Sequence, residues 1–389
     1  MRRSFALVLL LLGAPSHAVV AQTVIQAKEE LRIDAESHDL LPIWWLWVSP
    51  KGVMVASQPQ DWAFRFFAPD GTALGSFGRK GEGPAEFRNV QGTRAGWIGD
   101  TLWLTEAMQP RLTLVGPDRK LLRMERLPPA LLDPRGDAIS PALLTQAFVV
   151  GIAPDRSYQV MSMRLPNSPG PSWLADMAKG GLLLAIQARD GRFRQFIAGT
   201  PDDIAACERR QGGVSISVPF CPRPAMTEPL DRDRVVVAIP GTATASGGSF
   251  RLLALNASTG DTTLNREVRY RPVPIPTRVS DSIRTARNSN TRLPPAVRAA
   301  QSRTTFPPFY PPFRHLLTGR DGTIALSVYG AVAGKQRWRF LDPTGMDIGM
   351  VDFPATVRLF AIERGRAWGT DGEPGDQDSI VRYSWPAGR

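Results

Sequence analysis

Residue types suited to ligand recognition gather between Arg269 and Arg314. This segment holds nine arginines and a single acid, Asp281. Aromatic residues such as Phe309 and Tyr310 lie among the arginines. Guanidinium groups pair with carboxylate, sulfate or phosphate groups, and aromatic rings add cation–π contacts and stacking. The composition is typical of a site for an anionic or sugar ligand. A loop whose aromatics pack against the protein while its arginines face water would have the same composition.

A shorter charged stretch runs from Arg79 to Phe87 and is rich in glycine. Loops held by a rigid scaffold often carry the residues that bind ligands. The two stretches together supply our candidate binding residues, which are Arg79, Lys80, Glu82, Arg278, Arg284, Arg287, Phe309, Tyr310, Arg314 and His315.

The sequence lacks the spacings that catalysis needs. It has no Gly-x-Ser-x-Gly elbow, no His-Glu-x-x-His motif and no phosphate-binding glycine loop. Apart from His17 near the amino end, the only histidines are His38 and His315. A site built from several histidines therefore has almost no residues to use, and we predict no catalytic residue and no cofactor.

Acidic residues cluster near the carboxyl end, and Asp371, Asp376 and Asp378 could offer oxygen ligands to Ca²⁺. Their spacing departs from the alternating acids of an EF-hand loop. Solvated turn residues explain the cluster equally well, so these three aspartates are only weak metal candidates.

The only two cysteines are Cys207 and Cys221. Two cysteines this close in a protein outside the cytoplasm favour a disulfide over two free thiols. Gly212 and Gly213 lie near the middle of the intervening segment, where a hairpin could bring the cysteines together.

The amino end has the pattern of an export signal. Arg2 and Arg3 precede an apolar run from Phe5 to Leu12. A small-residue cleavage site that ends at Ala21 follows this run. Such a run is too short to span a bilayer, so we predict a signal peptide over residues 1–21 and a periplasmic or secreted mature protein without a transmembrane segment.

The formal net charge is +11, which favours acidic partners. At the cell envelope these would be a protein, an anionic glycan or lipid headgroups. Nucleic acid fits the charge but not the compartment. An arginine-rich solvated surface without a partner is the alternative.

An internal repeat predicts the fold. One unit is an apolar strand, a turn containing Asp or Thr with Gly, and a second strand; it recurs five times, beginning at Phe64, Leu112, Leu184, Leu252 and Trp338. Each copy follows a shorter apolar strand. That upstream strand occurs six times, at Lys51–Ser57, Asp100–Thr105, Asp155–Ser162, Asp233–Ala238, Asp321–Ser327 and Gly365–Thr370.

Six repeats of three or four short strands are typical of propeller blades. We predict an all-β, single six-bladed β-propeller of four-stranded antiparallel blades over residues 22–389. The last blade runs out after Trp385, one strand short. Val24 to Ile33 could supply this strand and close the ring; a disordered tail is the alternative.

The ten tryptophans could line a cofactor site, but most of them lie inside the strand repeats. We interpret Trp44, Trp47, Trp103, Trp338 and Trp368 as residues that pack the blades together.

The run from Phe77 to Phe87 resembles the linker between blades in NHL-repeat propellers, which is a glycine-rich turn ending in Phe and usually Pro. Here Arg88-Asn89-Val90 stands where the Pro after Phe would fall. The same family has a signature of a glycine, an apolar strand, a Trp and a Thr-Asp pair. Gly99–Glu106 and Gly365–Asp371 resemble this signature, and in the first of them Glu106 stands in place of the Asp. The resemblance to bacterial six-bladed propellers related to NHL repeats implies the fold and leaves function open.

Two insertions interrupt the repeat, at about 165–181 and 271–312. The second is expected to hold short helices at Ser280–Arg287 and Pro295–Ser302. Loops of this length are usually functional or disordered. The connections that enter an innermost strand share one face of a propeller with those between second and third strands. Arg79–Phe87, the basic insertion and Asp371–Asp378 would therefore share a surface.

These observations favour a monomeric binding or protein-interaction module with no evident catalytic site. One alternative is a hydrolase or lyase with an acid-based or metal-assisted site in the central channel. A structural role in an envelope assembly is the other.

Overall fold

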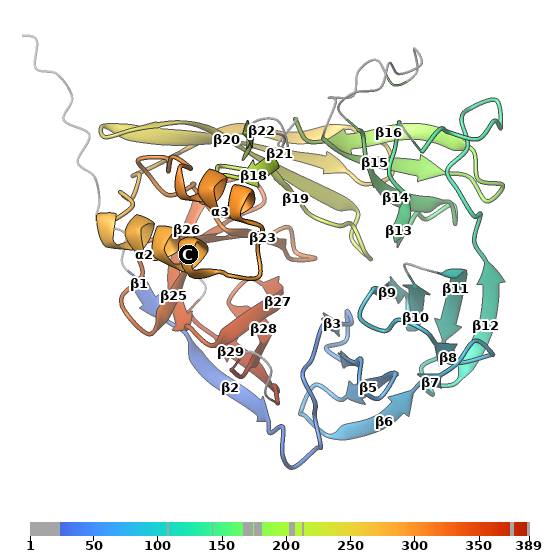
Figure 1. The fold of residues 1–389 in the computed structure, drawn as a ribbon. Coiled ribbons are helices and arrows are strands. Elements are labelled where there is room, and N and C mark those ends of the chain that lie inside the picture. Colours follow the sequence, from blue (N-terminus) through green and yellow to red (C-terminus); the bar gives the residue numbers. More distant parts are fainter. Residues whose placement is uncertain are drawn as a thin grey trace, which may run out of the picture.

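The computed structural model describes residues 24–106, 109–141, 143–165, 174, 181–201, 207–211, 214–373 and 377–386. The predicted signal peptide and most of the predicted insertion at 165–181 lie outside these ranges. Six antiparallel sheets of four strands each surround a common axis, with strands β3, β9, β13, β19, β23 and β27 innermost (Figure 1).

From the axis outward, the first three blades are β3 (Leu46–Val48), β4 (Met54–Gln58), β5 (Ala63–Phe67) and β6 (Ala73–Phe77); β9 (Thr93–Ile98), β10 (Thr101–Glu106), β11 (Gln109–Val115) and β12 (Leu121–Arg126); and β13 (Phe148–Ile152), β14 (Tyr158–Met163), β15 (Leu182–Gln187) and β16 (Phe193–Gly199). The last three are β19 (Ala225–Met226), β20 (Arg234–Thr244), β21 (Gly247–Asn256) and β22 (Thr262–Tyr270); β23 (His315–Thr318), β24 (Ile324–Val328), β25 (Lys335–Leu341) and β26 (Asp347–Pro354); and β27 (Val357–Glu363), β28 (Arg366–Asp371), β29 (Ser379–Ser384) and β2 (Lys28–Ile33). Two short ladders join β7 (Arg79–Lys80) to β8 (Glu86–Phe87) and β17 (Glu208–Gln211) to β18 (Val214–Ser217).

The predicted six-bladed propeller is confirmed. The five predicted hairpins are the third and fourth strands of blades 1 to 5, and the six upstream units are the second strands. Gly71 and Gly345 lie in the hairpin turns of blades 1 and 5 with φ of +94° and +76°, a region that favours glycine.

Apolar side chains fill the space between neighbouring blades. Phe64 of blade 1 and Leu102 of blade 2 belong to one such cluster and are almost completely buried. Trp103 and Trp368 are buried in the second strands of blades 2 and 6, as predicted. Trp44 departs from the prediction, because 45% of it is exposed.

The amino-terminal segment closes the ring, as predicted. Strand β2 pairs antiparallel with β29 and forms the outer strand of blade 6. The predicted single strand is nevertheless split in two. Its first part, β1 (Val24–Gln26), pairs parallel with β26 of blade 5. The Ala27 amide still bonds to the Asp352 carbonyl before the chain crosses to blade 6, so one segment holds two blades together.

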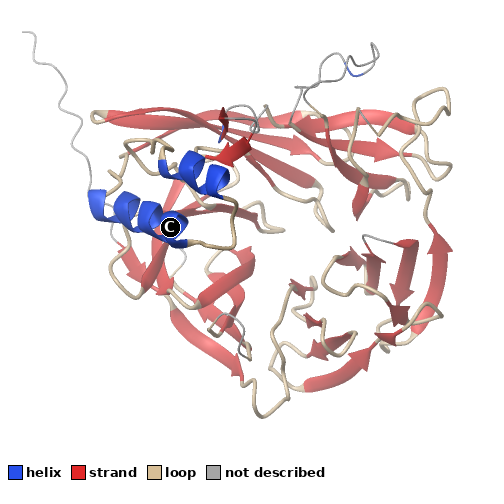
Figure 2. Cartoon of the chain, in the orientation of Figure 1, coloured by secondary structure: helices blue, strands red, loops and turns tan. Residues whose placement is uncertain are grey.

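Loops gather on two faces because successive strands of a blade run in opposite directions. Connections from second to third strands, and from one blade to the next, emerge on one face, which we call the loop face. Arg79–Phe87, the insertion at 271–312 and the segment after β28 all belong to this face. The insertion holds α2 (Thr277–Ser289), longer at both ends than predicted, and α3 (Pro295–Ser302), which matches its predicted bounds. Figure 2 shows both helices on one side of the propeller. No helix among the described residues is long and apolar enough to cross a membrane.

Candidate functional site

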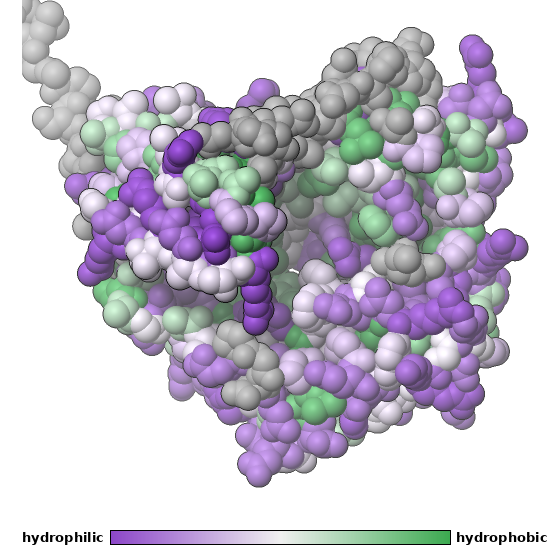
Figure 3. Space-filling model, viewed as in Figure 1, coloured by the Kyte–Doolittle hydropathy of each residue, from purple (hydrophilic) through white to green (hydrophobic). Residues whose placement is uncertain are grey.

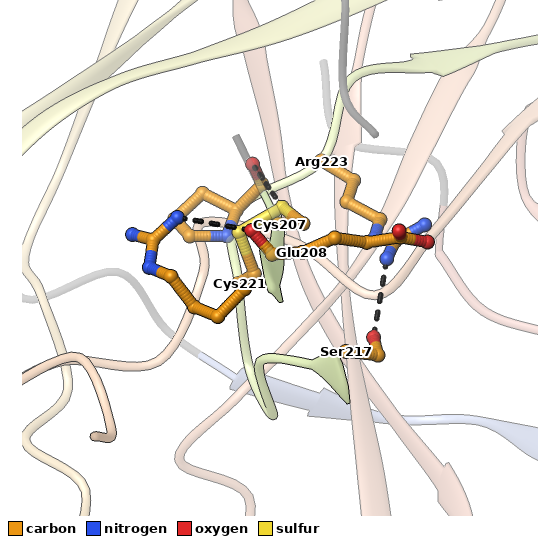
Figure 4. Close-up of a disulfide and its surroundings, with 7 residues drawn as sticks. Cys207, Glu208, Ser217, Cys221 and Arg223 are labelled. Atoms are coloured by element: carbon orange, nitrogen blue, oxygen red, sulfur yellow. Dashed lines mark hydrogen bonds between the residues drawn. A yellow bond between two sulfur atoms is a disulfide. The ribbon is translucent and has the colours of Figure 1, made fainter. Parts of the chain in front are cut away.

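A disulfide anchors part of the loop face. Cys207 and Cys221 are bonded at 1.94 Å, which confirms the predicted pair (Figure 4). Arg223 follows the bridge and donates a hydrogen bond to the Ser217 hydroxyl at 3.2 Å. A disulfide fits a protein that matures in an oxidising compartment outside the cytoplasm.

Aromatic side chains fasten the basic insertion to this disulfide segment. The Phe220 ring meets Tyr310 edge-on with the ring centres 4.9 Å apart, and it also faces Phe306 at 6.5 Å. Tyr310 in turn stacks on Tyr329 at 4.1 Å. This packing of Tyr310 fits the alternative interpretation of the sequence, and its contact with a ligand stays a prediction. Phe309 is half-buried and forms a backbone bridge with Pro274.

The candidate arginines of the insertion differ in their surroundings. Arg284 pairs with Asp281 at 3.0 Å, and Arg287 donates to the Ser217 carbonyl at 3.3 Å. Arg314 lies 4.0 Å from the centre of the Tyr329 ring. Arg278 is exposed on α2. Hydrophilic residues cover much of the region of α2 in Figure 3, whereas more apolar residues lie over α3.

His315, the last candidate of this stretch, begins the innermost strand of blade 5 and is exposed. Desolvation, followed by the positive charge of Arg314, lowers its pKa, so the imidazole is neutral at pH 7.

The candidates between blades 1 and 2 stabilise their own turn. Arg79 pairs with Glu86 at 2.9 Å, and Lys80 lies 5.0 Å from the ring centre of Trp62. Glu82 pairs with Arg88. The structure does not bring these three residues together with the arginines of the insertion.

Two of the weak metal candidates have other partners. Asp371 binds Arg32 at 2.6 Å and accepts a hydrogen bond from Thr356 at 2.5 Å. Asp378 accepts the Ile43 amide at 2.8 Å. Asp376 lies outside the described residues. Among the residues that the structure describes, no three His, Cys, Asp or Glu side chains form a metal-binding group.

Residues 227–233, which join β19 to β20 in blade 4, extend into the axis of the propeller. Leu230 bonds through its amide to the Val150 carbonyl of blade 3, and its side chain packs against clusters from blades 1, 2 and 3. A segment of blade 4 can reach blades 1 and 2 only through the central channel. We call residues 227–233 the axial plug.

Ion pairs attach the axial plug to blades on opposite sides. Glu228 pairs with Arg94 of blade 2 at 2.9 Å, and Asp231 pairs with Arg320 of blade 5 at 2.5 Å. Arg320 also donates to the Val48 carbonyl of blade 1 and approaches Glu363 of blade 6 at 4.0 Å. The Glu228 and Asp231 carboxylates of the plug therefore face guanidinium groups.

Two arginines flank a pair of aromatic rings at the mouth of the axis on the loop face. Arg94 lies 4.9 Å from the ring centre of Trp45, whose ring meets Phe360 edge-on at 6.2 Å. Arg358 lies 4.7 Å from the ring centre of Phe360. These four residues come from blades 2, 1 and 6, at or near the beginnings of innermost strands.

Two cavities open at this mouth. One of about 640 Å³ lies between blades 6 and 1 and is lined by Trp44 and Arg358. The other, of about 240 Å³, lies between blades 2 and 3 and is lined by Arg94 and Phe148. The adjacent residues Gln91 and Gly92 line one cavity each, so the two meet at the start of β9. Figure 3 shows the face hollowed near its middle.

Trp44 and Phe148 are 45% and 39% exposed at this mouth. We define the axial mouth as Trp44, Arg94, Phe148 and Arg358 with the two cavities. None of these four was among the predicted binding residues. Each precedes or begins an innermost strand, and the repeat spacing could have singled out these positions.

No protein-family profile and no curated protein matches the sequence. The fold is similar to a member of the DUF4221 family from Bacteroides vulgatus, at 11% identity and a TM-score of 0.49 over 93% of this chain and 98% of that chain. A putative exported protein from Bacteroides fragilis shows 8% identity and a TM-score of 0.43 over 93% and 96%. Virginiamycin B lyase from Staphylococcus aureus shows 10% identity and a TM-score of 0.40 over 92% and 100%. The propeller fold rests on the sheet topology and not on these likenesses, and the resemblance to NHL repeats remains a prediction.

Proposed function

We propose that this protein is an exported binding module that holds an anionic partner at the axial mouth. The observation that carries the proposal is the combination of the exposed Trp44, Phe148 and Arg358 side chains with half-buried Arg94 above a plugged channel. Arginine with an aromatic ring binds carboxylate, sulfate or phosphate groups and also packs against the apolar part of a ligand. Partners of this chemistry at the envelope are a protein, an anionic glycan or lipid headgroups.

The axial carboxylates fit a structural role better than an acid–base role. A general base needs an available lone pair within reach of substrate. Glu228 and Asp231, which lie on the axial plug, instead pair with Arg94 of blade 2 and Arg320 of blade 5. Burial raises the pKa of Glu363, outweighing Arg320, but Glu363 ends β27 on the face opposite the axial mouth.

Matched substitutions on the two faces test the proposal. Trp44 and Phe148 are exposed at the axial mouth, whereas Ile98 and Met346 are exposed to a similar extent in turns of the opposite face. We expect Trp44→Ala with Phe148→Ala to weaken binding to envelope fractions of the source organism, and Ile98→Ala with Met346→Ala to leave binding unchanged. Biolayer interferometry with the mature protein measures both. Equal binding by the two double variants would sink the proposal.

A further inference from the structure

A large cavity lies away from the axis, between blades 4 and 5 on the loop face. Its volume is about 1120 Å³. Its walls come from the outer strands β22 and β26, the hairpin turn at Ser246 and the base of the basic insertion. It shares no lining residue with the cavities of the axial mouth. We call it the rim cavity.

Two arginines without a matching acid distinguish the rim cavity. Four arginines line it, and none of its described lining residues is a carboxylate. Arg337 is held by Asp352 at 2.7 and 2.8 Å. Arg339 is held by Asp347 through two 2.6 Å hydrogen bonds. These two arginines are therefore neutralised and fixed in place.

The other two arginines are available. Neither Arg269 nor Arg271 forms an ion pair with any residue that the structure describes, and Arg271 is exposed. The Arg269 carbonyl accepts a hydrogen bond from Arg339 at 3.0 Å, which fixes the backbone from which the free guanidinium projects.

Aromatic rings form the remaining recognition surface. Tyr270 and Tyr329 line the cavity beside the arginines, and Phe250, which is almost completely buried, forms part of its wall. The Phe250 and Tyr270 rings contact each other at 6.2 Å, so each restrains the other. Desolvation raises the pKa of Tyr270, and its phenol therefore stays a neutral hydrogen-bonding group. Flat rings beside hydroxyl and guanidinium groups suit a sugar ring that carries an acidic group.

We propose that the rim cavity binds an anionic oligosaccharide, with Arg269 and Arg271 contacting its carboxylate or sulfate groups and Tyr270 packing against a sugar ring. The volume exceeds the usual 300–1,000 Å³ range of small-molecule pockets, so it accommodates several sugar residues rather than one headgroup. This site goes beyond the axial mouth and does not depend on it.

Calorimetric titration of the mature protein with oligogalacturonate, dextran sulfate and neutral dextran tests the inference. We expect one or both anionic sugars to bind and neutral dextran not to bind. The double variant Arg269→Ser with Arg271→Ser should bind about tenfold more weakly, the loss typical of one charge-assisted hydrogen bond. The variant Arg292→Ser with Arg303→Ser removes the same charge from exposed positions just after α2 and just after α3 and should bind within about twofold of the wild type.

A second variant keeps the charge and closes the space. Ser246 is exposed at the hairpin turn that borders the cavity, and Ser246→Trp should reduce binding while leaving the melting temperature unchanged. Equal losses in the two arginine variants would show general charge attraction and overturn the proposal. So would undiminished binding by Ser246→Trp, or tighter binding to phosphatidylglycerol vesicles than to either sugar. Loss of the axial-mouth partner would leave these results unchanged, so the two proposals fail separately.

Discussion

At the residue scale, Arg320 connects four parts of the molecule at the axis. It bonds to Asp231, whose side chain is 4% exposed, to the Val48 carbonyl and toward Glu363. Replacing Arg320 with Met would leave Asp231 buried without its counter-charge. We expect the free energy of unfolding to fall by about 3 kcal/mol.

Urea unfolding of the Arg320→Met variant measures this loss, and an exposed pair supplies the control. Lys51 and Asp100 pair at 2.6 Å with side chains 71% and 52% exposed. Lys51→Met should therefore cost less than about 1 kcal/mol. Equal losses for the two variants would show that the axial ion pairs are not a special source of stability.

The hydrogen bonds of Asp371 lead us to predict that closure of the ring weakens in acid. Burial alone would raise its pKa, but hydrogen bonds from Arg32 and Thr356 outweigh burial and lower the pKa. A group with a lowered folded pKa stabilises the protein fully above its unfolded pKa of about 4, and the contribution is lost as pH falls through the folded value. Stability should therefore fall below about pH 4.

Equilibrium unfolding at several pH values checks this closure prediction. Asp371→Asn removes the titrating group and should flatten the pH dependence between about pH 4 and the folded pKa. An unchanged slope in that variant would assign the acid sensitivity to other carboxylates. Glu30, which pairs with Arg382 at 3.1 Å across the same strands, is then the next group to replace.

Sequence reasoning located the charged and aromatic residues but not their partners. Tyr310 was a predicted ligand contact, yet its ring stacks on Tyr329, which lies 19 residues further along the chain. Trp44 was predicted to pack between blades and is exposed at the axial mouth. Both outcomes depend on which loops meet in space, and a pattern of single residues does not contain this information.

At the element scale, the hairpin turns differ in one residue that affects stability. Arg119 lies in the outer hairpin turn of blade 2 with φ of +63°, whereas the equivalent turns of blades 1 and 5 use glycine. A left-handed conformation costs a residue with a side chain roughly 1–2 kcal/mol, part of which glycine gives back as chain entropy in the unfolded state. Arg119→Gly should therefore stabilise the protein by up to about 1 kcal/mol.

Thermal unfolding of Arg119→Gly measures this gain, with the reverse exchange in blade 1 as its control. A Cβ at Gly71 would lie 3.0 Å from Leu31 Cδ1, and φ there is +94°. Gly71→Ala should lower the melting temperature. A rise in melting temperature for Gly71→Ala, or a fall for Arg119→Gly, would contradict the role assigned to these turns.

The disulfide should stabilise the insertion more than the blades. Cys207 and Cys221 enclose a segment of about 15 residues, for which loop-closure entropy predicts about 3 kcal/mol. Phe220 precedes Cys221 and its ring contacts Phe306 and Tyr310, so the constraint of the disulfide extends to the insertion. In a Cys207→Ala, Cys221→Ala variant we expect faster amide hydrogen exchange in α2, α3 and residues 306–311. Unchanged exchange there, or equally faster exchange in β10 and β11, would contradict this account.

Strands and turns were the easiest elements to predict, because runs of apolar residues and the glycines of tight turns are features of a few neighbouring residues. The bounds of α3 were also predicted, since Pro294 and Pro295 mark its beginning. The axial plug was missed. Residues 227–233 read as an ordinary turn between strands, and only the assembled ring shows that they reach blades 1 to 3.

At the scale of the whole molecule, ring closure and axial filling place the recognition surface. The amino-terminal segment joins blades 5 and 6, and the plug joins blade 4 to blades on both sides. This construction leaves the loop face as the place where arginines, aromatics and cavities coincide. The number of blades followed from the repeat, whereas the position of the cavities depends on how the inter-blade loops fold over the ring.

Site-specific photo-crosslinking in living cells tests the central claim most directly, which is that the partner binds at the axial mouth. A photoreactive phenylalanine analogue at Trp44 or Phe148 reports on the mouth, and the same analogue at Ile98 or Met346 reports on the opposite face. We predict one discrete crosslinked species from the first two positions and none from the other two. Crosslinks to the same species from Ile98 or Met346, with none from Trp44 and Phe148, would contradict the account.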